Sequence, residues 1–372
     1  MRHREYGEAV KIVAIGSPHV RTGSDDLKVV QFVSQAGDRR VGVVDGDQVA
    51  DVTSTNPGIQ SVYDAAQIAF ESDRSFEDVL SDAMKGATRI KYAELLAAPV
   101  DGSAPHLISP VAHADPHRVL VSGTGLTHTG SMQSRNQMHA KTASESKEPQ
   151  SDSAKMFQMG LEGGKPASGT RGVSPEWFYK GNGTAIKGPG DTLELPAFAL
   201  DGGEEPELAA CYMIDPDGTP RRLGFSLGNE WSDHETERIN YLYLAPSKLR
   251  ECAVGPELVT DFEFKELKLT CTVTRSGKTI YDSGTLFTGE EYMSHTLANC
   301  EDHHFKYPQH RVPGDAHVHF FGTSKLSFSS REWKFAPGDE IKIESPGFSQ
   351  PLKNTVASGP AAAGKVINVR KA

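Results

Sequence analysis

The sequence lacks the features that define several classes of protein. It has only four cysteines, Cys211, Cys252, Cys271 and Cys300, and no two of them form a Cys-x-x-Cys pair. This spacing argues against a thiolate zinc site and a disulfide framework, so we expect reduced thiols in a cytoplasmic protein. No segment approaches the roughly 18 consecutive apolar residues that a membrane span needs. We therefore expect no membrane partner.

Clusters of basic side chains are also missing. The 49 acidic and 39 basic residues give a formal net charge of −10, which disfavours nucleic acid and anionic membranes as partners. The 14 histidines among so many carboxylates favour metal or proton chemistry over phosphate binding. Residues 1–26 carry charges without the apolar stretch of a secretory signal, and we interpret them as a leader segment.

Residues 27–105 have the pattern of a small N-terminal α+β domain. Between Lys28 and Val52, short β-branched runs alternate with turn residues, which predicts a β meander. Residues 61–97 have helical spacing, and Ser75 is placed to cap a helix that begins at the next residue. A linker over 98–106 then leads into the rest of the chain.

Residues 106–372 are predicted to form the second, catalytic domain. Most of its patterned segments alternate with the period of strands, and few have helical spacing. The expected strands lie at 118–122, 194–200, 207–214, 222–227, 267–275, 278–281, 317–322 and 340–344, and the expected helices at 233–243 and 293–305. The polar residues 141–155 have little to bury, which indicates disorder or a lid over about 131–160. The fold class is α+β, with a mixed β-roll or barrel in place of a βαβ repeat.

Two glutamates in the segment Asp201-Gly-Gly-Glu-Glu-Pro-Glu207 are candidate metal ligands. Residues two apart on a strand share a face, so Glu205 and Glu207 can converge. Converging carboxylates repel unless a cation lies between them, and oxygen ligands favour a hard ion such as Mg²⁺, Mn²⁺ or Ca²⁺. Taken alone, the segment is more often a solvated acidic turn. Glu230 changes this balance, because it follows an apolar strand across a predicted hairpin and can complete a triad.

An ordered series of motifs resembles the fumarylacetoacetate hydrolase superfamily. The motifs are PEWFYK (175–180), GPGD (188–191), EPEL (205–208), GFSLGNEWS (224–232), SKLRECAVGPEL (247–258), FGT (321–323) and PGDEIKIESPGF with LKN (337–354). No single motif is specific, but the whole set occurs in order. The family's paired glutamates fall on Glu205 and Glu207, and its aspartate falls on Glu230, which keeps the charge on a longer side chain. The resemblance implies a Mg²⁺ site, with Mn²⁺ as an alternative, a mixed β-roll and a homodimer.

The resemblance also implies roles for residues around the metal. Lys248 matches an active-site lysine, which neutralises the charge of an enolate or acts as a base. Lys180 and Thr323 match positions that bind substrate, although outside the family a solvated lysine and a turn threonine are the simpler interpretations. Glu237 lies one helical turn after His234 on the face expected to point to the site. We predict that His234 binds substrate, that Lys248 is the first candidate for the general base and that Glu237 is the second.

The segment Gly125-Leu-Thr-His-Thr-Gly-Ser131 bears on the type of reaction. In the C–C hydrolases of the family, a histidine followed by a glutamate activates water; here that histidine position falls on Ser131, and His128 falls on the usual tyrosine. This departure is similar to the branch that dehydrates 2-keto-3-deoxy sugar acids. The motifs GLEGGKP (160–166) and NYLYLAPSKLR (240–250) also resemble bacterial proteins that are linked by name to arabinose metabolism. We therefore expect a dehydratase of a pentonate-like 2-keto-3-deoxy aldonate that yields an α-keto semialdehyde. Ser131 would bind the substrate, and His128, Glu162 or Glu237 would protonate the leaving hydroxyl.

Two other functions stay open at this point. The first is an acylpyruvate-type C–C bond hydrolase of the same fold, with His128 in place of the usual base. The second is a non-catalytic protein that binds sugar acids, which would need neither Lys248 nor a complete carboxylate triad.

Two further patterns compete with the glutamate triad. Several histidines gather late in the chain, and His317-x-His319 on a strand would present two imidazoles as a metal pair does. A polar strand face beside the active site is the simpler interpretation. Gly123-x-Gly125 is a poor dinucleotide-binding fingerprint, because the third glycine is misplaced.

Overall fold

The computed structural model describes residues 26–130, 133 and 151–372. Apart from Asp26 and Gln133, the predicted leader and the part of the predicted lid before Ser151 lie outside the described residues. Most of the described chain is strand and loop with few helices, and parallel and antiparallel strand pairs occur together. The predicted fold class, a β-rich mixed α+β fold, is therefore confirmed. None of the described helices is both long enough and apolar enough to cross a membrane.

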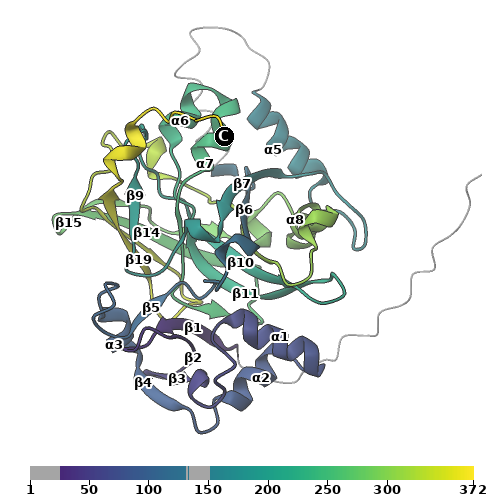
Figure 1. The fold of residues 1–372 in the computed structure, drawn as a ribbon. Helices are drawn as coiled ribbons and strands as arrows, with labels where there is room; N and C mark the ends of the chain where they lie inside the picture. The colour runs from purple at the N-terminus through teal and green to yellow at the C-terminus, as the bar shows by residue number, and fades with distance from the viewer. Residues whose placement is uncertain (1–25, 131–132, 134–150) are drawn as a thin grey trace, which may run out of the picture.

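A large mixed sheet forms the centre of the molecule (Figure 1). Among the described residues its main path has the strand order β4-β3-β2-β1-β13-β11-β10-β17-β6-β7, and β5, β8 and β12 join it at the side. Its strands are β1 (Lys28–Val33), β2 (Arg39–Asp45), β3 (Gln48–Asp51), β4 (Thr88–Lys91), β5 (His106–Ile108), β6 (Val119–Gly125), β7 (Glu176–Asn182), β8 (Ile186–Lys187), β10 (Pro206–Ile214), β11 (Pro220–Asn229), β12 (Cys252–Val254), β13 (Leu258–Val259) and β17 (Ala316–Phe320).

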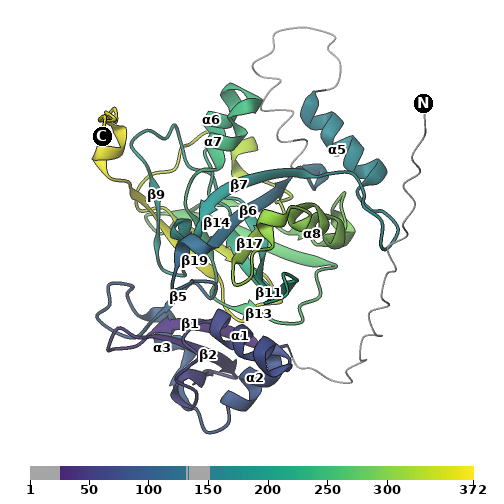
Figure 2. The same cartoon turned by 45° about the vertical axis from the view of Figure 1, so that its right-hand side comes forward.

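A smaller sheet packs beside the large one, with the order β15-β14-β18-β19-β9 and with β16 beside β14. Its strands are β9 (Thr192–Leu195), β14 (Leu267–Arg275), β15 (Lys278–Asp282), β16 (Leu286–Thr288), β18 (Glu340–Glu344) and β19 (Leu352–Ser358). The α-helices of the described residues are α1 (Val62–Ser72), α2 (Phe76–Ala83), α3 (Tyr92–Ala97), α5 (Asp152–Gly163), α6 (His234–Ile239), α7 (Leu244–Lys248) and α8 (Leu297–Phe305). Figure 2 shows α8 against β17 and β6.

The N-terminal strands continue the large sheet. In Figure 1, β1–β4 and α1–α3 lie together below the other elements. Strand β1 nevertheless pairs with β13, with Lys28 opposite Val259, and one apolar core contains Val41 and Val62 as well as Ala209. Pairing and core thus cross residue 105, and the division into two domains there stays a prediction.

Several elements lie where the sequence patterns predict them. Strands β14 and β18 have the predicted bounds, and β10 contains the predicted strand 207–214. The side chain of Ser75 accepts a hydrogen bond from the backbone N–H of Asp78 at 3.0 Å and caps α2. These features depend on local patterning and capping, which a single sequence records.

Other elements differ from the prediction for identifiable reasons. Residues 88–91, within the predicted helical stretch, form edge strand β4 because they pair with β3. The strand predicted at 194–200 ends at Leu195, since Pro196 has no N–H for a sheet. The helix predicted at 233–243 breaks at Asn240, which is extended. The helix predicted at 293–305 begins later, at Leu297, after its cap Thr296.

The predicted polar lid includes the first turn of a helix. Residues 152–155 belong to α5, and the side chain of Ser151 caps this helix by accepting from the N–H of Ala154 at 3.2 Å. The prediction of disorder is therefore wrong for these four residues, and the prediction of a lid stays a prediction. Residues 141–150 lie outside the part of the chain that the structure describes.

Strand β10 separates two apolar cores. All nine of its residues are buried. Ala209, Cys211 and Met213 pack in the core shared with the N-terminal strands. The alternate residues Leu208 and Ala210 pack in the core shared with the smaller sheet. A strand held on both faces is a rigid support, so Glu207 in this strand and Glu205 directly before it are held in place.

Candidate metal centre

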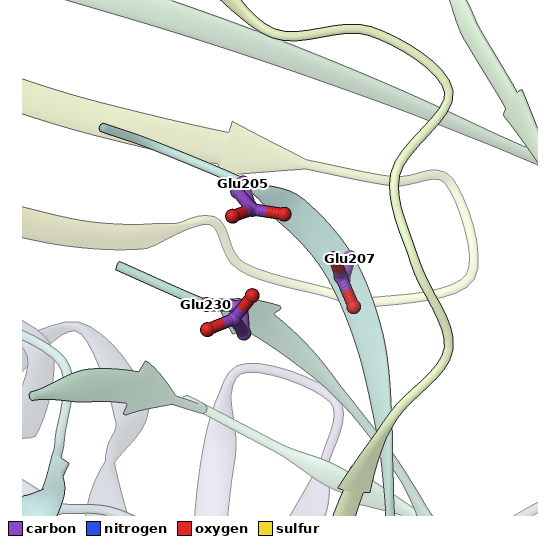
Figure 3. A group of neighbouring side chains, drawn as sticks. All are labelled: Glu205, Glu207 and Glu230. Carbon is purple, nitrogen blue, oxygen red and sulfur yellow. The ribbon is translucent and has the colours of Figure 1, made fainter. Parts of the chain in front are cut away.

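The three glutamates come from neighbouring ends of one hairpin. Glu205 precedes β10, Glu207 lies in it, and Glu230 directly follows β11. The two strands pair with Glu207 opposite Gly228, and their turn is closed by a hydrogen bond from the N–H of Gly218 to the carbonyl of Asp215 at 3.0 Å. All three side chains are buried, and one oxygen of each lies within 4.8 Å of one from each of the others (Figure 3). The hairpin therefore gathers three carboxylates around one point.

The pKa values of the three glutamates reflect their burial next to one another. Burial and the charges of Glu205 and Glu230 hold the pKa of Glu207 well above its usual range. Burial and Glu205 also raise the pKa of Glu230. Burial alone would raise the pKa of Glu205 too, but Lys248 and His234 outweigh it and hold that pKa well below the usual range. The N–H of Gly322 donates to Glu207 Oε2 at 2.7 Å and fixes this carboxylate.

Two buried lysines have different places in the cluster. The ammonium group of Lys248 forms ion pairs with Glu205 and Glu230, and it lies 4.7 Å from the ring centre of Phe178. Burial opposes the charge of Lys248, but the neighbouring glutamates raise its pKa above the ordinary value. Lys180 Nζ contacts Glu230 Oε1 at 2.6 Å and the carbonyls of Trp231 at 2.5 Å and Lys248 at 3.1 Å. All three N–H groups of Lys180 thus have acceptors within the protein.

His234 and Glu237 reach the same cavity from the first turn of α6. This helix begins at His234 because the side chain of Asp233 accepts from the N–H of Thr236 at 3.1 Å. Residues three apart on a helix share a face, so both side chains point to one side. His234 Nε2 lies 3.0 Å from Glu205 Oε1, and its buried Nδ1 has no hydrogen-bond partner among the described residues.

The glutamates and the surrounding side chains form one cavity. Its lining residues are Gly125, Leu126, Phe178, Glu205, Glu207, His234, Glu237, Lys248, Gly322, Thr323 and Leu326, with Glu230 and Lys180 packed directly behind. When all are ionised, four carboxylates against two ammonium groups leave two negative charges in excess. A divalent cation would neutralise this excess, and three converging carboxylate oxygens suit the hard ion Mg²⁺. The residues present therefore fit a magnesium site.

The predicted site residues do not all gather here. Seven of them lie together: Glu205, Glu207, Glu230, Lys248, His234, Glu237 and Thr323. Lys180 binds Glu230 from behind. His128 does not line the cavity: its Nδ1 lies 2.9 Å from Thr127 Oγ1 and its Nε2 3.1 Å from Thr288 Oγ1, and burial lowers its pKa to about 4. Glu162 is exposed on α5 and accepts from Gln158 at 2.7 Å. Ser131 lies outside the described residues.

The histidine pair on β17 is part of a hydrogen-bonded interior. His317 Nδ1 lies 3.0 Å from His304 Nε2, and His319 lies between Ser122 Oγ at 2.9 Å and Thr124 Oγ1 at 2.7 Å. Burial lowers the pKa of both His317 and His319 to about 3. Within the described ranges the three glutamates are the one group of three or more acidic, histidine or cysteine side chains close enough to hold a metal.

Sequence reasoning missed several residues that line the cavity or hold its ligands. Gly322 and Ser232 lie inside the motifs FGT and GFSLGNEWS, so motif membership was a signal for both. Ser232 Oγ donates to Glu230 Oε1 at 3.1 Å, and Gly322 contributes only its backbone N–H. Leu126 and Leu326 form part of the apolar wall. Leu126 lies inside the segment 125–131 singled out above, whereas nothing in the sequence context of Leu326 distinguishes it from a core leucine.

Comparison with solved structures identifies the fold. No family model matches the sequence. Two solved structures of a 2-keto-3-deoxy-D-arabinonate dehydratase align with TM-scores of 0.64 (an apo form, 19% identity, 90% of this chain and 99% of that chain) and 0.63 (a complex with magnesium and 2,5-dioxopentanoate, 18% identity, 89% and 99%). A fumarylacetoacetate hydrolase from Exiguobacterium antarcticum aligns with a TM-score of 0.58, 17% identity, and 90% and 100% coverage. The chain has the fumarylacetoacetate hydrolase fold.

The resemblance noted in the sequence motifs is thereby confirmed at the level of the fold. A curated relative with a similar sequence is a "Probable 2-keto-3-deoxyxylonate dehydratase" of Haloferax volcanii, 26% identical over 189 residues. These residues are 50% of this chain, and the alignment spans 61% of the relative's length. In a fumarylacetoacetate hydrolase fold with this cavity, the identity of the substrate has to be argued from the site itself.

Proposed function

We propose that this chain is a Mg²⁺-dependent dehydratase of a 2-keto-3-deoxy sugar acid, with a pentonate as the preferred substrate. The observation that carries the proposal is the buried triad Glu205, Glu207 and Glu230 with Lys248 and Glu237 at the same cavity. The relative from Haloferax volcanii and the structure complexed with magnesium and 2,5-dioxopentanoate support the same reaction class. Neither comparison favours the Mn²⁺ alternative.

The triad would hold the metal, and the remaining side chains would act on the substrate. A bound Mg²⁺ supplies Lewis acidity toward the oxygens of an α-keto acid, which makes the proton at C3 easier to remove. Lys248 carries a positive charge next to Glu205 and Glu230. That charge is well placed to stabilise the enolate formed when the C3 proton leaves. Lys248 therefore serves better as a cation than as the general base that the sequence predicts.

Glu237 is the better candidate for proton transfer. It lines the cavity, whereas the other two candidate acids, His128 and Glu162, do not. One carboxylate can take the C3 proton and return it to the C4 hydroxyl, which then leaves as water. The resulting C3–C4 double bond tautomerises to place a carbonyl at C5, so the product is an α-keto semialdehyde and no redox partner is needed.

His234 and Thr323 would bind the substrate. His234 Nε2 is held by Glu205, which directs its Nδ1 away from the carboxylate, and Thr323 is the hydroxyl residue that lines the cavity. The apolar side chains Leu126, Phe178 and Leu326 complete the wall and exclude water from the reacting carbons.

Hydrolysis of an acylpyruvate is the second candidate, because the fumarylacetoacetate hydrolase from Exiguobacterium antarcticum has the same fold. It requires a base that activates water. His128, the substitute for the usual base, bonds through both ring nitrogens to threonine side chains and does not line the cavity. This placement favours dehydration over hydrolysis.

A product analysis distinguishes the functions. The purified chain would be incubated with Mg²⁺ and separately with 2-keto-3-deoxypentonates and with acylpyruvates, and the products identified by mass spectrometry. Loss of one water from a pentonate supports the dehydratase. Uptake of water with two carbon fragments from an acylpyruvate would replace it with the hydrolase. Tight binding of the sugar acid without any product would indicate the non-catalytic binding protein.

A further inference from the structure

The acidic segment 201–207 has a second face that the metal site does not use. Glu204 is 1% exposed and bonds to Ser327, whereas its neighbour Glu205 contacts His234 and Lys248. Both of its carboxylate oxygens accept from one residue: the N–H of Ser327 donates to Oε1 and the hydroxyl of Ser327 donates to Oε2, each at 2.7 Å. No ion pair of Glu204 with a cationic side chain occurs among the described residues. A buried carboxylate without a cation is costly, so these two charge-assisted hydrogen bonds must compensate for its desolvation.

The same segment is tied along its length to residues 322–335, which we call the strap. Arg331 donates to Asp201 Oδ2 at 3.0 Å and to the carbonyl of Gly202 at 2.6 Å. The N–H of Phe335 donates to Asp201 Oδ1 at 3.0 Å. At the other end of the strap, the N–H of Gly322 donates to the metal-site residue Glu207 at 2.7 Å. The bonds to Ser327 are the anchor between these two ends.

Ser327 lies between two side chains that shape the site. Leu326 lines the cavity on one side, and the ring of Phe328 lies 5.3 Å from the ring of His234 on the other. Because both the backbone and the hydroxyl of Ser327 are held by Glu204, the positions of Leu326 and Phe328 are held with them. Leu326 forms an apolar wall together with Leu126 and Phe178 in a cavity that carboxylates, a lysine and a histidine also line. Such a wall excludes additional hydroxylated carbons, since these would lose their hydrogen bonds to water.

We propose that Glu204 is a positioning residue that acts through Ser327 to set Leu326 as the wall which limits the chain length of the substrate. The proposal rests on the proposed function, because it concerns discrimination between sugar acids in the same cavity. It assigns the two faces of one acidic segment to different tasks. Glu205 and Glu207 serve the metal, and Glu204 and Asp201 hold the strap that selects what is bound beside it.

The test compares Ser327→Ala and Glu204→Gln with Ser330→Ala. Ser327→Ala removes the hydroxyl bond but keeps the backbone bond, and Glu204→Gln keeps the shape but removes the charge. Ser330 is a matched control on the same strap, because its hydroxyl bonds weakly at 3.4 Å to the carbonyl of Ser327 and not to segment 201–207. Holoenzyme with Mg²⁺ is assayed with 2-keto-3-deoxypentonate and 2-keto-3-deoxyhexonate, and kcat and KM are determined separately.

We expect the first two variants to raise KM for the pentonate with little change in kcat. The preference for the pentonate over the hexonate, as a ratio of kcat/KM, should fall by about tenfold, which is typical of one wall contact. Ser330→Ala should keep the wild-type preference. An equal fall of kcat for both acids with an unchanged preference would overturn the proposal, since Glu204 would then act on the metal ligands and not on the wall.

A second measurement does not depend on turnover. The side chain of Lys325 is exposed while the strap on either side is anchored, so trypsin should cut the Lys325–Leu326 bond slowly in the wild type and in Ser330→Ala. Cleavage should be severalfold faster in Ser327→Ala and Glu204→Gln under conditions where circular dichroism shows both to be folded. Equal cleavage rates in all four proteins would overturn the proposal. If the wild type dehydrates no sugar acid, the proposed function fails, while the cleavage rates still decide whether Glu204 holds the strap.

Discussion

The backbone N–H of Glu230 donates a hydrogen bond to the backbone carbonyl of Glu205 at 3.0 Å. Two of the three candidate metal ligands are therefore joined through the main chain of the β10–β11 hairpin. Their separation is set by strand pairing and not by side-chain packing. The cluster can consequently keep its shape even though its carboxylates repel one another, and this rigidity makes substitutions within the cluster informative.

Glu207→Gln should abolish Mg²⁺ binding without loss of folding. Burial, Glu205 and Glu230 raise the pKa of Glu207 and so disfavour its ionised form in the metal-free protein; a neutral amide at this position avoids that cost. We expect the melting temperature without metal to stay equal to that of the wild type or to rise. Isothermal titration calorimetry should show at least a hundredfold loss of Mg²⁺ affinity. Mutation of a residue that only hydrogen-bonds a metal ligand already lowers metal affinity by about 10–100-fold, so loss of a ligand itself should cost more.

The control for this variant is Glu162→Gln, which changes an exposed glutamate on α5. It should leave both Mg²⁺ affinity and stability unchanged. An unaltered affinity in Glu207→Gln itself would falsify the proposed triad.

Lys180→Met should mainly lower the free energy of unfolding, with a smaller effect on substrate affinity. Lys180 and Glu230 are both fully buried and 2.6 Å apart, and removal of the lysine breaks one of the two buried ion pairs of Glu230, which then keeps only Lys248 as a cationic partner. Such losses cost about 3–5 kcal/mol, which urea unfolding would measure. Lys187→Met is the control, because Lys187 pairs with Glu251 at 2.8 Å but is partly exposed, and it should cost about 1 kcal/mol or less. Equal stability of Lys180→Met and wild type would show that Glu230 does not depend on this lysine.

Gly203→Ala should damage the site through His234. A Cβ atom at position 203 would overlap the imidazole ring of His234, whose Nε2 lies 3.0 Å from Glu205. The ring would have to turn away from the carboxylate. We expect a fall of about tenfold or more in kcat/KM, as for misplacement of a group beside the reacting atoms, with a smaller change in Mg²⁺ affinity. Wild-type kinetics in this variant would remove His234 from the candidate substrate-binding residues.

The buried histidines of β17 should make the protein sensitive to acid. Burial lowers the pKa of His317 and His319 to about 3, whereas an unfolded histidine titrates near 6.5. Between these two values the unfolded chain binds more protons than the folded chain, so stability falls as pH decreases. The slope approaches about 1.4 kcal/mol per pH unit for each such histidine.

Urea unfolding at pH 7, 6 and 5 would measure this dependence. His319→Gln keeps a polar side chain between Ser122 and Thr124 but cannot titrate, so its stability should fall less steeply with pH. His117→Gln, at an exposed position, is the control. A wild-type stability that does not change between pH 6 and pH 5 would contradict the prediction.

Local patterns in the sequence predicted much of the fold and part of the site. Strands β14 and β18 and the cap at Ser75 depend on neighbouring residues only, and the Glu-x-Glu spacing predicted two converging carboxylates. Strand β4 was missed because its residues are strand only through pairing with β3. The role of Lys180 was also out of reach, since its acceptors are the carbonyls of Trp231 and Lys248 as well as Glu230.

The sequence by itself determined the chemistry available to this protein: an excess of carboxylates, no thiolate metal site, and the alternation that places Glu205 and Glu207 on one face. Only the tertiary structure decided which groups meet. It joined Glu204 to Ser327, far away in the chain, and it moved His128 away from the cavity lining. The physical reason is that alternation and capping act over a few residues, whereas these contacts depend on how two sheets pack across the whole chain.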